Sequence, residues 1–164
     1  MKALIVMISS SIHTPPVLHV TVPATAVSPA FSAKAMLDLQ ARQYYATSIT
    51  MEHPGIRLTS ARVHQNPIQR TMAPVLRGML AETNKALLIA HPLLRKWATG
   101  KPQRPVRQTL ISEPDAPTLQ GAALVYQFAK LAGEAPVKAL ARAAGIERAQ
   151  AAEWLKIARA FSIL

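Results

Sequence analysis

Glycine and proline residues divide the stretch 114–164 into three short segments, and this punctuation constrains the fold more than any other feature of the chain. The segments begin at Asp115 to Pro117, at Pro136 and at about Arg148, and they end at Gly133, Gly145 and about Phe161. Asp and Pro are favoured at helix starts, and Gly is favoured just past helix ends. The spacing therefore predicts three helices joined by tight turns.

Each predicted helix has one apolar face to bury, because its large apolar residues recur three and four positions apart. The faces consist of Leu124, Val125, Phe128, Leu131 and Ala132, then Val137, Leu140, Ala141 and Ala144, then Ala151, Trp154, Leu155, Ala158 and Phe161. Ala141 is small enough for a close helix crossing, and Gly145 can adopt the positive φ of a tight turn. This predicts a helix-turn-helix. The alternative is a plain three-helix bundle with no role in nucleic-acid binding.

The opposite face of the third predicted helix combines small and polar side chains. Arg148 and Gln150 carry donors that the base edges of guanine and adenine accept, and the alanines beside them permit a close approach. The predicted DNA-binding residues of this module are Arg148, Ala149, Gln150, Ala152, Glu153, Lys156 and Arg159, with Lys138 on the preceding helix.

Residues 136–159 read PVKALARAAGIERAQAAEWLKIAR. This run resembles the C-terminal helix-turn-helix of small bacterial and phage proteins, whose tails follow P-x-x-A-[LV]-A-x-x-x-G-[IV]-x-R-x-x-A-x-x-W-[IL]-x-x-A-R. Helix-turn-helix segments of sigma factors and regulators share its core. With the preceding helix, the resemblance covers about 50 of the 164 residues. It implies DNA binding with Arg148 as the leading contact, and it does not extend to the first 110 residues.

The chain is strongly basic, with 19 Lys and Arg against eight Asp and Glu and a net charge of +11. Such a charge favours a polyanionic partner, nucleic acid first and an anionic membrane surface second; a solvated surface without a partner is the alternative. The stretch 95–113 contains two prolines and five basic residues, Arg95, Lys96, Lys101, Arg104 and Arg107. It is predicted to be an extended basic linker that contacts phosphates.

Residues 1–94 are predicted to form a small mixed α+β domain. Strands are expected at 3–8 and 17–22, a helix within 31–44, and a β-hairpin whose strands, 45–51 and 56–63, flank the turn 53–55. A secretory signal over residues 1–26 is the alternative to the first strand, but its apolar run is shorter than the roughly 7–15 residues expected of a signal.

Helices are expected from Asn66 and Pro67 onward, because an N-cap side chain before a proline is a good helix start. Pro74 is predicted to break or restart this helix, Asn84 to mark a bend, and Pro92 to disrupt the segment that follows.

The composition also narrows the possible chemistry. The chain has no cysteine, which excludes disulfides, thiolate zinc sites and cysteine nucleophiles and fits a reducing cytoplasm. The five histidines, His13, His19, His53, His64 and His91, have no metal-ligand spacing, and the glycines form no phosphate-binding loop. We therefore expect no enzyme activity, no metal and no cofactor.

Together these features predict an α+β protein: a mixed domain over 1–94, a basic linker over 95–113 and a helix-turn-helix domain over 114–164. The predicted function is sequence-specific binding of double-stranded DNA by a dimeric, cytoplasmic transcriptional regulator. The alternative is a structural or accessory DNA protein of a phage or mobile element, such as a packaging subunit or recombination factor, whose N-terminal zone contacts other proteins. A DNA-modifying enzyme ranks third.

Overall fold

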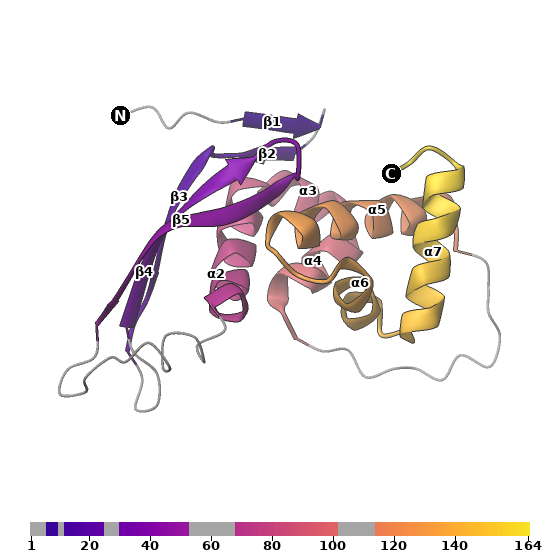
Figure 1. Cartoon of the computed structure of the whole chain (residues 1–164). Coiled ribbons are helices and arrows are strands. Elements are labelled where there is room, and N and C mark those ends of the chain that lie inside the picture. Colours follow the sequence, from indigo (N-terminus) through magenta and orange to yellow (C-terminus); the bar gives the residue numbers. More distant parts are fainter. Residues whose placement is uncertain (1–5, 10–11, 25–29, 53–67, 102–113) are drawn as a thin grey trace.

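The computed structural model describes residues 6–9, 12–24, 30–52, 68–101 and 114–164 (Figure 1). Its strands are β1 (Val6–Ser9), β2 (Ile12–Thr14), β3 (Val17–Val22), β4 (Ala30–Asp38) and β5 (Gln43–Glu52). Its helices are α2 (Ile68–Thr83), α3 (Lys85–Ala90), α4 (Pro92–Thr99), α5 (Ala116–Leu131), α6 (Pro136–Ala144) and α7 (Arg148–Ala160). The mixed α+β composition predicted from the sequence is confirmed.

Strands β3, β4 and β5 form an antiparallel sheet in that order, and β1 pairs with β2 in a separate two-stranded ribbon. Alternate residues of β3 and β4 are buried on the side of the sheet that α2 covers, among them Val20, Phe31 and Ala33 (Figure 1). The helix predicted within 31–44 is therefore wrong. The helical spacing of apolar residues in this segment is weak. Buried and exposed residues instead alternate along β4, which gives the sheet one complete apolar face.

The strand predicted at 17–22 is confirmed as β3, and the strand of residues 6–9 overlaps the one predicted at 3–8. The strand predicted at 45–51 lies within β5, which pairs with β4 across the turn of residues 39–42. The second half of the predicted hairpin, including the turn at 53–55, lies outside the described residues, as do Asn66 and Pro67.

Helix α2 continues through Pro74, so the predicted break at that residue is wrong. Pro74 lies on the exposed side of α2, whereas Met72, Leu76 and Leu80 are buried. Proline disfavours a helix interior by about 3 kcal/mol, and burial of these three side chains, each favourable by about 1.5–3 kcal/mol, offsets that cost. The predicted bend at Asn84 is confirmed, and so is the disruption at Pro92, because α3 ends at Ala90; a new helix, α4, then begins at Pro92, which was not predicted.

The side chain of Asn84 connects the end of α2 to the β1–β2 ribbon. Its Oδ1 accepts a hydrogen bond from the backbone N–H of His13 at 2.9 Å, and its Nδ2 donates to the backbone oxygens of His13 at 2.8 Å and Leu80 at 2.9 Å. Next to this contact, the buried Tyr44 hydroxyl donates to the backbone oxygen of Pro15 and is hydrogen-bonded to Thr14. Burial raises the pKa of Tyr44, so this phenol stays protonated as a donor.

We expect Asn84→Ala to lower the free energy of unfolding by about 2–3 kcal/mol, because it leaves polar backbone groups without partners. Urea denaturation of both proteins measures the difference. Thr83→Ala is the matched control, since its exposed hydroxyl bonds only within α2. Equal losses in the two variants would show that Asn84 does not join the ribbon to the helix.

The three helices predicted in 114–164 are present as α5, α6 and α7. The Asp115 side chain accepts from Thr118 N–H at 3.0 Å at the start of α5, and Gly133 and Gly145 adopt φ of 72° and 69° at the ends of α5 and α6. The prediction that Phe161 is buried is wrong, because α7 ends at Ala160 and the Phe161 side chain is 69% exposed. A helical repeat places a residue on the buried face only while the helix continues.

The hydrophobic core continues across the predicted domain boundary at residue 94. Leu94 and Trp97 of α4 are fully buried, and the Trp97 ring meets that of Phe128 edge to face at a centroid distance of 5.6 Å. Helix α4 packs against α5 and α6. The predicted extended linker is therefore wrong for Arg95 through Thr99, because burial of Leu94 and Trp97 favours a helix there. The remainder from residue 102 to 113 lies outside the described residues.

Candidate nucleic-acid interface

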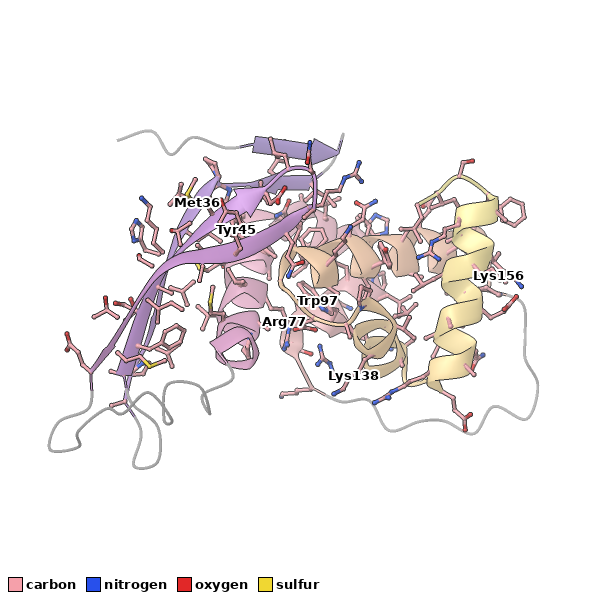
Figure 2. The ribbon with its side chains drawn as sticks, in the orientation of Figure 1. Met36, Tyr45, Arg77, Trp97, Lys138 and Lys156 are labelled. Atoms are coloured by element: carbon pink, nitrogen blue, oxygen red, sulfur yellow. The ribbon has the colours of Figure 1, made fainter. Side chains whose placement is uncertain are left out.

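One face of α7 is buried and the other is open to solvent. Ala151, Leu155 and Ala158 pack into the core, which fixes how the helix is rotated about its axis. Arg148 is the first residue of the helix and is exposed. The exposed side carries four more of the predicted residues, Ala149, Ala152, Glu153 and Lys156. Figure 2 shows Lys156 directed away from the body of the protein. Gln150 is half-buried at the edge of this face.

The charges on this face are only weakly engaged with one another. Lys156 Nζ lies 3.5 Å from Glu153 Oε1, and both side chains are exposed, so the pair contributes little to stability. Among the described residues, Arg148 forms no ion pair. The face therefore presents two cations, Arg148 and Lys156, together with the carboxylate of Glu153 and two methyl groups.

The other predicted DNA-binding residues lie on several surfaces. Lys138 is exposed near the start of α6, and Arg95 and Lys96 are exposed on α4, with Lys101 just beyond it. Arg104 and Arg107 lie outside the described residues. Arg159 is exposed too, but its guanidinium carbon lies 5.4 Å from the centroid of the Tyr126 ring, and it lines a hollow with residues of α5. Arg159 therefore lies about three helical turns from Arg148, at the opposite end of α7, with its side chain turned toward α5.

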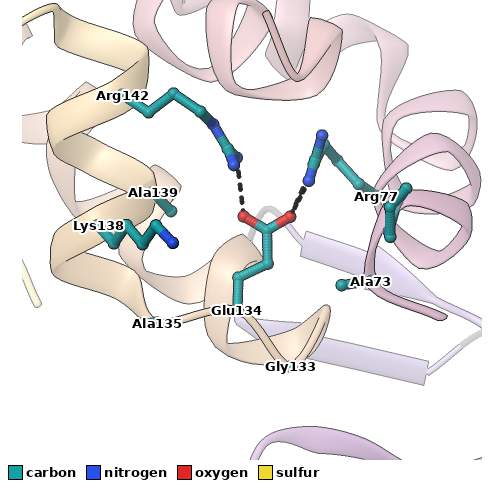
Figure 3. Close-up of a pocket in the computed structure, with 9 residues that line it drawn as sticks. Ala73, Arg77, Gly133, Glu134, Ala135, Lys138, Ala139 and Arg142 are labelled. Atoms are coloured by element: carbon teal, nitrogen blue, oxygen red, sulfur yellow. Dashed lines mark hydrogen bonds and ion pairs between the residues drawn. The ribbon is translucent and has the colours of Figure 1, made fainter. Parts of the chain in front are cut away.

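An ion network that the sequence did not reveal joins α2, the turn between α5 and α6, and the last turn of α6 (Figure 3). Glu134 is 10% exposed and accepts from Arg77 Nε at 2.8 Å through Oε1 and from Arg142 at 2.9 Å through Oε2. The guanidinium carbon of Arg77 also lies 5.8 Å from the centroid of the Trp97 ring. The three ion-paired side chains and Lys138 line a hollow of about 300 Å³. Arg77 and Glu134 are 57 positions apart, and no sequence spacing indicates such a contact.

Within the described ranges, no group of three His, Asp or Glu side chains is placed to bind a metal ion. None of the helices in the described part of the chain combines the length and apolar character needed to cross a bilayer.

Comparison of the chain with protein families, with curated proteins and with solved structures found no match.

Proposed function

We propose that the protein binds double-stranded DNA in a sequence-specific manner through the exposed face of α7. The observation that carries the proposal is the arrangement of this face: Arg148 at the helix start and Ala149, Ala152 and Lys156 on the exposed side, above a buried row that anchors the helix. An α-helix fits the major groove, and alanines at its surface let the polar side chains reach base edges. Early residues of such a helix are the ones that contact bases.

Several surrounding features support this role. Helix α6 ends at Gly145 in the left-handed conformation, and α7 begins three residues later, a spacing suited to a helix-turn-helix. Lys138 on α6, Arg95 and Lys96 on α4 and the net charge of +11 supply cations for phosphates. We place the protein in the cytoplasm as a dimeric transcriptional regulator, in keeping with a cysteine-free sequence and with the twofold symmetry of many operators.

We expect Arg148→Ala to relax specificity at one base position in each half-site, because arginine held bidentately on guanine contributes about 1–3 kcal/mol of discrimination. Binding selections from a random duplex library, performed side by side with wild type, measure the change. Lys138→Ala should instead weaken binding to all sequences alike and reduce the salt dependence by about one counterion.

Lys34→Gln is the matched control for these variants, since Lys34 is an exposed cation on the sheet, on a different element from α7. Selection of the same motif with equal stringency by wild type and Arg148→Ala would show that Arg148 does not contact bases. Selection of no motif by the wild type would reject sequence-specific binding.

A second candidate is an accessory DNA protein of a phage or mobile element that uses its sheet to contact another protein. Met36 and Tyr45 are opposite each other on β4 and β5 and are 36% and 49% exposed (Figure 2). Such an exposed pair is suited to a protein contact. Light scattering of the protein with duplex DNA separates the candidates, because a regulator forms dimers on its site, whereas a packaging or recombination factor forms larger assemblies.

A further inference from the structure

A second hollow lies where the turn between β4 and β5 meets α5 and α7, and its volume is about 290 Å³. The turn contributes Gln40 and Arg42, α5 contributes Gln127 and Lys130, and α7 contributes Arg159. Figure 1 shows this turn next to α5. Ligand pockets have volumes of roughly 300–1,000 Å³, so the hollow is at the lower limit of this range, where only a small molecule fits, and it is too small for a duplex.

Three cations, Arg42, Lys130 and Arg159, line this hollow, and no acidic side chain does. Leu164, the last residue of the sequence, also lines it, and its terminal carboxylate forms no ion pair with any of the three cations. In the part of the chain that the structure describes, none of the three forms an ion pair, and only one of the eight acidic residues, Glu113, lies outside that part. Asp38 is close in sequence, but its Oδ1 accepts from the backbone N–H groups of Gln40 at 2.8 Å and Ala41 at 2.9 Å. The three positive charges outnumber the single terminal carboxylate and repel one another, and a bound anion relieves this repulsion.

One of the three cations is held in place by a neighbouring ring. Arg159 lies over the Tyr126 ring, which limits the freedom of its guanidinium. Arg42 belongs to the β4–β5 turn, where its φ of 50° is a left-handed conformation that is uncommon for residues other than glycine. Guanidinium groups bind phosphate and carboxylate oxygens through paired hydrogen bonds, and the amides of Gln40 and Gln127 add further donors.

We propose that this hollow binds a small organic anion with two or more adjacent anionic groups, such as a phosphorylated or polycarboxylate metabolite. The site is separate from Arg148 at the start of α7, because Arg159 lies about three helical turns away and is directed to α5, and the other two cations come from the β4–β5 turn and α5. The inference does not depend on DNA binding.

Calorimetric titration of the full chain with sodium pyrophosphate, and in a second series with citrate, tests the proposal at constant ionic strength. We expect saturable binding of one anion per chain for at least one of the two probes, and the stronger binder identifies phosphate or carboxylate as the preferred group. Arg42→Asn and Lys130→Gln should each lower the association constant about tenfold. Asparagine tolerates the left-handed conformation, so Arg42→Asn preserves the turn.

Lys34→Gln removes one positive charge from the exposed side of the sheet and should leave anion binding unchanged, as should Arg148→Ala. Circular dichroism confirms that each variant is folded. The proposal is overturned if neither probe binds at millimolar concentration, or if Lys34→Gln weakens binding as much as Arg42→Asn does, since the anion then responds only to net charge. If the protein binds the anion but selects no DNA motif, the proposed function is rejected and the anion site stands.

Discussion

Replacing Trp97 with alanine should lower the free energy of unfolding by about 3–5 kcal/mol, as expected when a large aromatic side chain leaves a cavity in a core. Trp97 is fully buried, packs edge to face on Phe128 and carries the Arg77 guanidinium on its ring. Its loss therefore removes contacts to α2 and α5 as well as apolar burial. Chemical denaturation monitored by circular dichroism measures the change without relying on the fluorescence of the deleted indole.

Two variants make the Trp97 experiment specific. Arg95→Ala removes an exposed side chain from the same helix and should change stability by no more than about 0.5 kcal/mol. Trp97→Phe should cost less than Trp97→Ala, because a phenyl ring fills much of the space of the indole and leaves a smaller cavity. The indole N–H has no hydrogen-bond partner among the described atoms, so its removal leaves no acceptor unpaired. A small effect of Trp97→Ala would mean that residues 95–99 are a tether after all.

Glu134→Gln should destabilise the protein by about 3 kcal/mol, because breaking a buried ion pair leaves uncompensated charge in the interior. Glu134 serves both Arg77 and Arg142, which are themselves only 12% and 25% exposed. An amide supplies one acceptor oxygen in place of two and carries no charge. Thermal and urea denaturation of wild type and variant measure the difference.

Glu82→Gln is the matched control for Glu134→Gln, since Glu82 pairs with Lys85 on the surface, where such a pair is worth about 0–1 kcal/mol. Combining Glu134→Gln with Arg142→Met should recover part of the loss, because the second change removes one of the stranded charges. Strictly additive losses, or equal losses for Glu82→Gln and Glu134→Gln, would contradict the buried network.

Local signals in the sequence were sufficient to predict the helices of the C-terminal third. The Asp115 cap and the left-handed Gly133 and Gly145 act on the few residues around them, so their effect does not depend on distant parts of the chain. The composition of the α7 face follows from the same helical repeat. Gly145 and the turn after it set the first residue of α7, and the helical repeat counted from that residue places Arg148, Ala149 and Lys156 at exposed positions.

Tertiary packing overrode local signals where they were weak or in competition. Residues 31–38 carry a faint helical stripe, but their alternation completes the buried face of a sheet made with β3 and β5. Pro74 disfavours a helix, yet α2 continues because its apolar side is buried. The cations and prolines of 95–113 predicted an extended chain. Burial of the Trp97 side chain in the core instead favours a helix, α4, through residue 99.

The sequence by itself determined where helices α5 to α7 begin and end and which side of α7 is polar, because caps and periodicity operate over a few residues. Only the tertiary structure decided which charges meet. Glu134 joins Arg77 to Arg142, and Arg42 comes to line one hollow with Lys130 and Arg159, because packing of the sheet and helices brings these distant positions together. Contacts between residues so far apart depend on the whole core, and no local spacing encodes them.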